Sequence, residues 1–212
     1  MIKAVLFDFD GVVVQSEALH MKTFLELLAP YGVKVPEKRW YREFAGTGSR
    51  HIFEVLCEEF RIPEDVGALV ERRKKLYEGY VRGGALKEMP GVREFLSELQ
   101  KRKISCAIVS GSHRTNVKLA LSLLNLEPYF QLIVSGDDME KRKPDPEPFL
   151  HAARMLNVPP SECLVIEDSL PGCEAAKRAG MRFVAMKSPA SEALNGYDAM
   201  INDFTEFPLE ML

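Results

Sequence analysis

Short runs of consecutive apolar residues recur along the chain, and most of them end next to a polar residue. The first run covers residues 4–7 and is followed directly by Asp8. Because such a run lacks hydrophobic–polar alternation, it is typical of a strand buried on both faces of a parallel sheet. Later runs of the same kind predict further strands at residues 104–109, 132–134, 164–166 and 183–186.

Helical patterns separate these runs. One of them begins after Pro90 and has an apolar face made of Val92, Phe95, Leu96 and Leu99. Similar spacing predicts helices over residues 115–124, 147–156 and 171–179. Gly180 then stands in the left-handed position that ends the last helix. Alternating strands and helices with right-handed crossovers predict an α/β fold, a doubly wound, Rossmann-like parallel sheet with helices on both faces.

Residues 16–84 interrupt this alternation, because apolar residues there repeat at helical spacing with no strand pattern between them. We therefore predict a core domain formed by residues 1–15 and 85–212, and an inserted α-helical cap domain over residues 16–84. The pair Gly83-Gly84 and the loop after Gly11 are candidate hinges, since glycine tolerates the backbone angles that a moving lid adopts.

Composition narrows the classes of partner. The chain has 212 residues and a formal net charge of -3, which is not the basic footprint of a nucleic-acid binder. No apolar stretch reaches membrane-spanning length, and the chain runs from Met1 straight into a strand, without a signal-peptide pattern. The four cysteines have no zinc spacing, so free thiols and a cytoplasmic location are expected. The oligomeric state is left open, and a monomer is compatible with the sequence.

Polar residues follow four of the predicted strands, at the edge where ligands bind in open parallel sheets. They are Asp8, Asp10, Ser110, Lys143, Glu167 and Asp168. Carboxylates gathered there would repel one another by about 4 kcal/mol for each close pair, so a cation is required. Oxygen ligands without histidine or thiolate favour Mg²⁺.

These residue types suit phosphoryl transfer. Asp8 is the candidate nucleophile, and Asp10 is the candidate general acid and base. The segment Ser110-Gly111-Ser112 stands between a strand and a helix, where its hydroxyl and amide groups can bind phosphate, and Lys143 adds positive charge. Each feature alone is common in turns and helix caps. The prediction rests on their occurring in order at the ends of buried strands.

The four motifs together resemble those of the haloacid dehalogenase-like hydrolase superfamily, in its branch with a helical cap, over nearly the whole chain. They are Asp8-Phe9-Asp10-Gly11-Val12, Ser110, Lys143-Pro144-Asp145-Pro146 and Glu167-Asp168-Ser169. The resemblance implies Mg²⁺ bound by Asp8, the backbone carbonyl of Asp10 and Asp168, with Glu167 nearby or acting through water. It also implies phosphoryl transfer over dehalogenation, because the dehalogenating members lack the second aspartate.

Two cap segments, residues 16–20 and 46–50, resemble those of beta-phosphoglucomutases and their phosphatase relatives. The resemblance implies that His20 orients Asp10 and that Arg50 binds a distal phosphate or another anion. Packing of His20 within a helix at the domain seam explains that residue equally well. Mutases usually carry lysine before the cap glycine, where this chain has Ala45. Gln15 and Arg142 depart from the family pattern as well.

The leading hypothesis is therefore a Mg²⁺-dependent phosphatase that hydrolyses a small phosphorylated metabolite, such as a sugar phosphate, through an aspartyl phosphate. The alternative is a phosphosugar mutase of the beta-phosphoglucomutase type, and Ala45 favours the phosphatase. A third hypothesis is a non-enzymatic phospho-receiver, which also combines acidic residues, a lysine and a doubly wound sheet. The inserted cap argues against it, because receivers have no use for a lid that excludes water.

Overall fold

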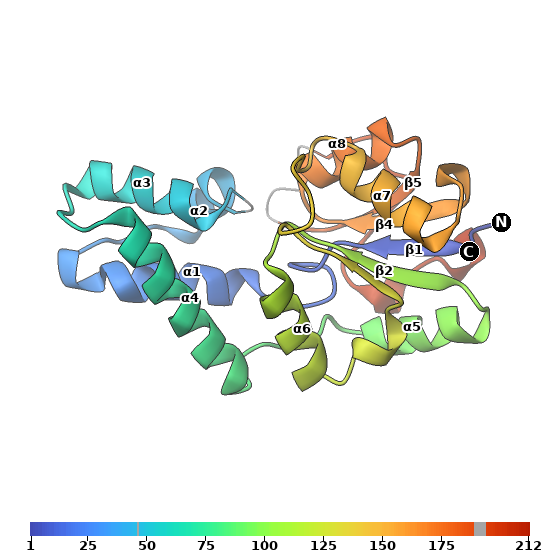
Figure 1. Ribbon diagram of the computed structural model, residues 1–212, viewed down its shortest axis with the longest axis horizontal. Helices are drawn as coiled ribbons and strands as arrows, with labels where there is room; N and C mark the ends of the chain where they lie inside the picture. Colours follow the sequence, from blue (N-terminus) through green and yellow to red (C-terminus); the bar gives the residue numbers. More distant parts are fainter. Residues whose placement is uncertain (46, 189–193) are drawn as a thin grey trace. The chain divides into compact units, whose positions relative to one another are not determined.

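The computed structural model describes residues 1–45, 47–188 and 194–212. The chain divides into two compact units. The core unit consists of residues 1–15 and 87–212, and the helical unit of residues 16–86. Both units can be followed by colour in Figure 1. The domain bounds predicted from the sequence are residues 1–15 with 85–212 for the core domain and residues 16–84 for the cap domain. As bounds of independent domains, they stay a prediction.

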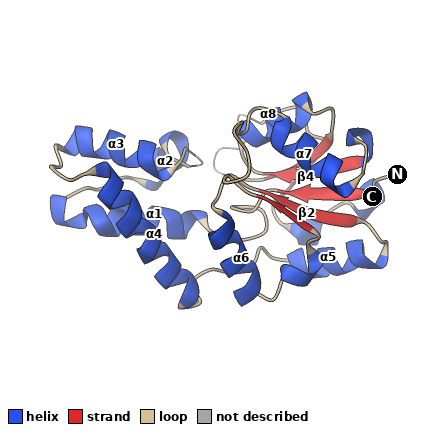
Figure 2. Ribbon diagram, in the orientation of Figure 1, coloured by secondary structure: helices blue, strands red, loops and turns tan. Residues whose placement is uncertain are grey.

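The core unit is built on a six-stranded sheet whose strand pairs are all parallel, in the order β3-β2-β1-β4-β5-β6. Figure 2 shows these strands in red. The strands are β1 (Ala4–Phe7), β2 (Ser105–Val109), β3 (Leu132–Val134), β4 (Cys163–Glu167), β5 (Arg182–Met186) and β6 (Ala199–Ile201). The predicted doubly wound parallel sheet is confirmed, and β6 is a strand that the sequence pattern did not predict.

Helices cover both faces of this sheet. In Figure 2, α7 and α8 lie above the strands, whereas α5 and α6 lie below them. The bounds are α5 (Val92–Lys101), α6 (Arg114–Leu123), α7 (Glu147–Leu156) and α8 (Leu170–Arg178). Their caps follow from the sequence. The Ser169 hydroxyl accepts a hydrogen bond from the Gly172 amide at the start of α8, and Gly180 adopts φ 69° after its end.

The strands are buried as their sequences require, since every residue of β1 and β4 is buried. On one face of the sheet, Phe7 packs against the rings of Phe95 and Phe204. β1 lies between β2 and β4, and the chain proceeds outward from it in both directions. The sheet therefore changes direction at β1, and ligand sites in such sheets lie beyond this point, at the carboxyl ends of the strands.

The helical unit contains α1 (Glu17–Leu28), α2 (Glu37–Glu43), α3 (Ser49–Phe60) and α4 (Val66–Arg82). Its described residues form no strand. A core of aromatic and aliphatic side chains holds these helices together, including Phe24, Trp40, Phe44, Phe53, Leu56 and Leu69. In neither unit do the described residues form a helix with both the length and the apolarity to cross a membrane.

Candidate active site

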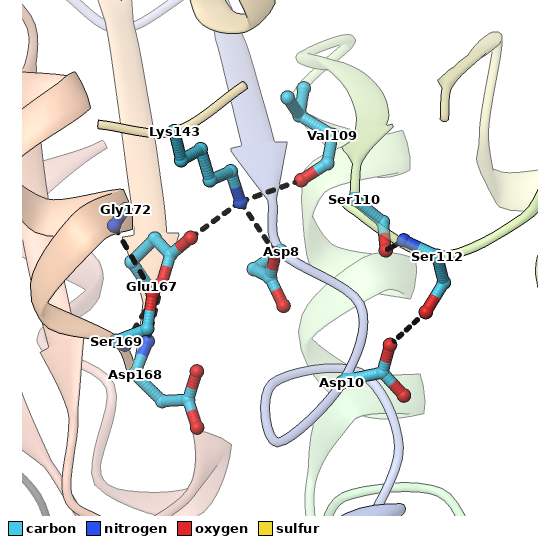
Figure 3. A network of polar contacts seen from close by, with 10 residues as sticks. All are labelled: Asp8, Asp10, Val109, Ser110, Ser112, Lys143, Glu167, Asp168, Ser169 and Gly172. Atoms are coloured by element: carbon cyan, nitrogen blue, oxygen red, sulfur yellow. Dashed lines mark hydrogen bonds and ion pairs between the residues drawn. The ribbon is translucent and has the colours of Figure 1, made fainter. Parts of the chain in front are cut away.

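Lys143 joins the ends of three adjacent strands. Its ammonium nitrogen lies 2.5 Å from Asp8 Oδ1 and 2.5 Å from Glu167 Oε1, and it donates a 2.8 Å hydrogen bond to the Val109 carbonyl. Figure 3 shows these three contacts converging on Nζ. The strands β1, β2 and β4 thus deliver one partner each to the same cation, as the predicted placement at the carboxyl edge requires.

Glu167 is a fully buried carboxylate. While Oε1 contacts Lys143, Oε2 accepts hydrogen bonds from the Asp168 amide at 3.0 Å and from the Ser169 amide and hydroxyl at 2.9 Å each. Space for it exists because residue 172 is glycine. A Cβ atom there would lie 1.8 Å from Glu167 Oε1. Both oxygens of this carboxylate are therefore engaged in contacts that hold Lys143 and the turn after β4 in place.

The charges at this edge alter two pKa values. Burial raises the pKa of Asp8 to about 7, and the carboxylates of Glu167 and Asp10 add to the effect while Lys143 opposes it. Burial lowers the pKa of Lys143, but the carboxylates of Asp8 and Glu167 outweigh it and raise that pKa above its usual value. Lys143 consequently stays charged at neutral pH. Asp8, with a pKa of about 7, binds a proton near neutral pH when Lys143 is the cation beside it.

Asp10 follows Asp8 on a tight turn. Gly11 adopts φ 77°, and its amide donates to the Val14 carbonyl at 2.9 Å. The Ser112 hydroxyl donates a 2.5 Å hydrogen bond to Asp10 Oδ2, and the Ser112 amide donates to Ser110 Oγ at 3.0 Å. The loop after β2 therefore reaches the acidic turn after β1, so the structure brings Ser110 and Ser112 to Asp10.

The oxygen donors at this edge fit a small, hard cation. A Cβ atom at Gly11 would lie 2.3 Å from Asp168 Oδ2, so this carboxylate lies against the turn that carries the Asp10 backbone. In Figure 3, Asp168 and Asp10 lie on the opposite side of Asp8 from Lys143. Among the described residues, no three His, Cys, Asp or Glu side chains are grouped as a metal site. Two carboxylates, a backbone carbonyl and water are the ligand set that Mg²⁺ commonly takes.

His20 and Arg50 belong to the helical unit. His20 Nδ1 lies 2.5 Å from Arg73 Nη2, and its ring stacks on Tyr77 with centroids 4.7 Å apart. Arg50 is exposed in the first turn of α3. Their roles toward Asp10 and a distal phosphate stay predictions. Gly46, part of the cap resemblance, lies outside the described residues.

The sequence analysis missed the loop after β3. Gly136, Asp137 and Asp138 lie against the loop that carries Ser112, and the Gly136 amide donates to the Ser112 carbonyl at 3.0 Å. The sequence feature that could have pointed to these residues is their position, because they follow β3, which ends at the same edge of the sheet as β1 and Asp8. Acidic residues there resemble an ordinary turn, and only the fold shows what they contact.

A known family model covers most of this chain. Residues 5–186 match the family model described as haloacid dehalogenase-like hydrolase. The chain therefore belongs to the haloacid dehalogenase-like hydrolase family, which confirms both the resemblance and the prediction of an enzyme of this class.

The proteins with similar sequences include some that are named as phosphatases and others whose names state no activity. The chain is 35% identical over 185 residues to a phosphorylated carbohydrates phosphatase of Thermotoga maritima, covering 86% of this chain and 84% of that protein. It is 30% identical over 218 residues to protein CbbY of Cereibacter sphaeroides, covering 97% and 94%. It also matches protein SUPPRESSOR OF QUENCHING 1, chloroplastic, of Arabidopsis thaliana at 35% identity over 196 residues. That match covers 91% of this chain but only 18% of the plant protein's length.

Solved structures show the same architecture. CbbY from Rhodobacter sphaeroides in complex with phosphate superimposes with a TM-score of 0.83 at 26% identity, covering 97% of this chain and 96% of that one. A beta-phosphoglucomutase from Clostridium difficile gives a TM-score of 0.84 at 23% identity, covering 100% and 95%. At that identity the second likeness bears on the fold alone.

Proposed function

We propose that the chain is a Mg²⁺-dependent phosphatase that hydrolyses a small phosphorylated metabolite, such as a sugar phosphate, through an aspartyl phosphate. One observation carries this proposal: Asp8, a carboxylate at the switch point of the sheet, is held by Lys143 at 2.5 Å. A carboxylate fixed in this way is positioned to attack, and the ammonium beside it can balance charge on the phosphoryl group. The name of the Thermotoga maritima relative supports a phosphorylated carbohydrate as substrate.

In the first step, an Asp8 oxygen attacks phosphorus and the ester P–O bond breaks. The departing alkoxide takes the proton of Asp10 and leaves as an alcohol. In the second step, water attacks the phosphorus of the aspartyl phosphate and gives a proton back to Asp10. The bond between Asp8 and phosphorus breaks, so free phosphate and the original carboxylate result. Ser112, which donates to Asp10 Oδ2, orients the carboxyl that carries this proton.

The rest of the edge stabilises charge. The Ser110 hydroxyl and the Gly111 amide are the donors of the proposed phosphate-binding loop before α6, and the Ser112 amide, which donates to Ser110 Oγ, holds that hydroxyl in place. Lys143, which donates to the Val109 carbonyl just before this loop, contributes the positive charge. Glu167 acts through Lys143 and through the Asp168–Ser169 turn, because both of its oxygens are already engaged there.

Mg²⁺ would be held by Asp8, Asp168 and the Asp10 backbone carbonyl, with Glu167 behind them. When bound, it neutralises charge on the phosphoryl oxygens as the transferring group forms and loses its bonds. We also propose a cytoplasmic, reducing location, which is supported by the four cysteines, all buried and free.

The proposal is tested by measuring phosphate release from a panel of phosphorylated sugars, nucleotides and short organic acids. The protein should release phosphate in Mg²⁺ buffer, most efficiently from one of the sugars, and should stop when EDTA removes the ion. Release that is equally fast in EDTA would overturn the dependence on metal. Absence of release from every substrate would overturn the phosphatase.

A further inference from the structure

We infer that Asp137 is a positioning residue for the general acid, acting through Ser112. This inference rests on the proposed function, because it assigns a task within the same reaction. It concerns the loop after β3, residues 135–138, which contacts the phosphate-binding loop, residues 110–114, at several points within the core unit.

The first contacts are made by the Asp137 carboxylate. Oδ2 accepts a hydrogen bond from the Arg114 amide at 2.8 Å, and Oδ1 lies 2.7 Å from His113 Nδ1. These are the two residues directly after Ser112, where the loop enters α6. The His113 side chain does not cap that helix itself. Asp137, which lies on the loop after β3, therefore holds the C-terminal end of the phosphate-binding loop.

The second contact is between backbones. The Gly136 amide donates to the Ser112 carbonyl at 3.0 Å, and a Cβ atom at residue 136 would lie 2.3 Å from the Gly111 carbonyl oxygen. Only glycine permits this approach without a shift of one loop. The loop after β3 thus contacts the phosphate-binding loop at Gly111 and Ser112, and Ser112 is the residue whose hydroxyl faces Asp10.

Asp138 holds the supporting loop in turn. Its Oδ2 accepts hydrogen bonds from the Ser135 amide and hydroxyl, each at 2.6 Å, and lies 2.5 Å from Arg114 Nη2. The Arg114 guanidinium also donates to the Ile133 carbonyl at 2.7 Å. Both loops are consequently tied to β3, which is an edge strand of the sheet.

The reason this support matters is the position of one hydroxyl. Ser112 Oγ donates to Asp10 Oδ2 at 2.5 Å, while Gly111, just before it, is exposed, and a Cβ atom added to it would meet nothing within 4 Å. Such a loop has little packing of its own to fix the hydroxyl. When Asp137 is removed, Ser112 loses its register against Asp10, and the proton is delivered less well to the leaving oxygen.

This makes the leaving group the natural probe. An alkoxide released from a sugar phosphate needs the proton of Asp10, whereas 4-nitrophenolate departs without it. The Asp137→Ala variant should lower kcat/KM about tenfold on the best sugar phosphate of the panel, since general-acid assistance is worth at least that much. It should lower kcat/KM on 4-nitrophenyl phosphate less than about twofold. The constant kcat/KM is compared because it reports the step in which the leaving group departs, whereas kcat also contains the hydrolysis of the aspartyl phosphate that both substrates share.

A matched control exists at the opposite edge of the sheet. Asp198 also accepts a hydrogen bond from a backbone amide, that of Phe183 at 2.9 Å, and pairs with the adjacent Arg182 at 3.0 Å. The Asp198→Ala variant therefore loses a contact with a backbone amide and one with a neighbouring cation, at strands that β4 separates from β1. Its ratio of the two kcat/KM values should equal that of the unaltered protein.

Two further variants keep the test decisive. Asp137→Asn retains an acceptor oxygen for the Arg114 amide, so its ratio for the two substrates should stay close to that of the unaltered protein. This variant also provides a test if Asp137→Ala fails to fold. In a Ser112→Ala background, Asp137→Ala should change the ratio no further, because the group through which it acts is gone.

The inference is overturned if Asp137→Ala lowers kcat/KM equally for both substrates, if Asp198→Ala shifts the ratio as much, or if the shift persists in the Ser112→Ala background. Each of these results requires that the unaltered protein turns over both substrates. If it turned over neither, the proposed function itself would fail.

Discussion

The Lys143 ammonium lies 2.5 Å from Glu167 Oε1, a carboxylate oxygen of a side chain that is fully buried. A buried charge that loses its partner is far more costly than a buried pair, because nothing then repays its desolvation. Glu167 therefore makes Lys143 a structural requirement as well as a participant in the proposed chemistry.

The first prediction separates these two tasks. Lys143→Met should lower the free energy of unfolding by about 3–5 kcal/mol, since it leaves Glu167 buried without its cation. The double variant Lys143→Met/Glu167→Gln should recover part of this loss, because the amide oxygen can still accept from the Ser169 amide. Urea denaturation measures both. A double variant no more stable than the single one would contradict the assignment, and neither variant should regain turnover.

The second prediction concerns the glycine beneath Glu167. Gly172→Ala should lower kcat and the free energy of unfolding, the latter by about 1–3 kcal/mol, because the added methyl group displaces the Glu167 carboxylate from Lys143. Gly79→Ala is the matched control, since it too lies in a helix but has nothing within 4 Å of its added Cβ. It should raise stability by about 0.5–1 kcal/mol and leave kcat unchanged. Equal effects of the two substitutions would refute this explanation.

These contacts show what the sequence pattern could and could not predict. Strand β1 is predicted with its observed bounds, because all four of its residues are buried and form an apolar run. β3 and β6 are both edge strands of three residues, two of them only partly buried. β3 is nevertheless predicted because two of its three residues are β-branched, whereas β6 has only one, Ile201.

The same limit applies to the site. Asp8 and Glu167 could be predicted to lie close together, since parallel strands end at one edge of the sheet. The partition of the Glu167 oxygens between Lys143 and the Ser169 turn could not, because it depends on rotamers and on the space at Gly172. Nor could the support that Asp137 gives to Arg114, since it joins two loops whose sequences read as ordinary turns.

The third prediction concerns pH. In the metal-free protein, burial raises the pKa of Asp8 to about 7, so below this pH its carboxyl holds a proton that must leave before Mg²⁺ binds. Affinity for Mg²⁺ should therefore rise about tenfold between about pH 6 and pH 8, as the ionised fraction of Asp8 rises. Titration calorimetry at the two pH values measures this, with Asp8→Asn as the control that should lack the rise. Equal affinities in the unaltered protein would contradict it.

The fourth prediction separates hydrolysis from phosphoryl return. Ala45 stands where mutases usually carry a lysine, so no cation at that position can hold the second phosphate of a bisphosphate intermediate. With beta-glucose 1-phosphate as substrate, phosphorus-31 NMR should show free phosphate and no glucose 6-phosphate. Accumulation of glucose 6-phosphate would establish the mutase instead.

The fifth prediction addresses the nucleophile, on which the account depends. A reaction of the Mg²⁺-loaded protein with its best substrate, quenched in acid within one turnover, should carry a phosphoryl group on the peptide that contains Asp8. Mass spectrometry with fragmentation should place the group on the Asp8 side chain, and Asp8→Asn should show neither the adduct nor turnover. A phosphoryl group found on another residue, or turnover retained by Asp8→Asn, would contradict the account.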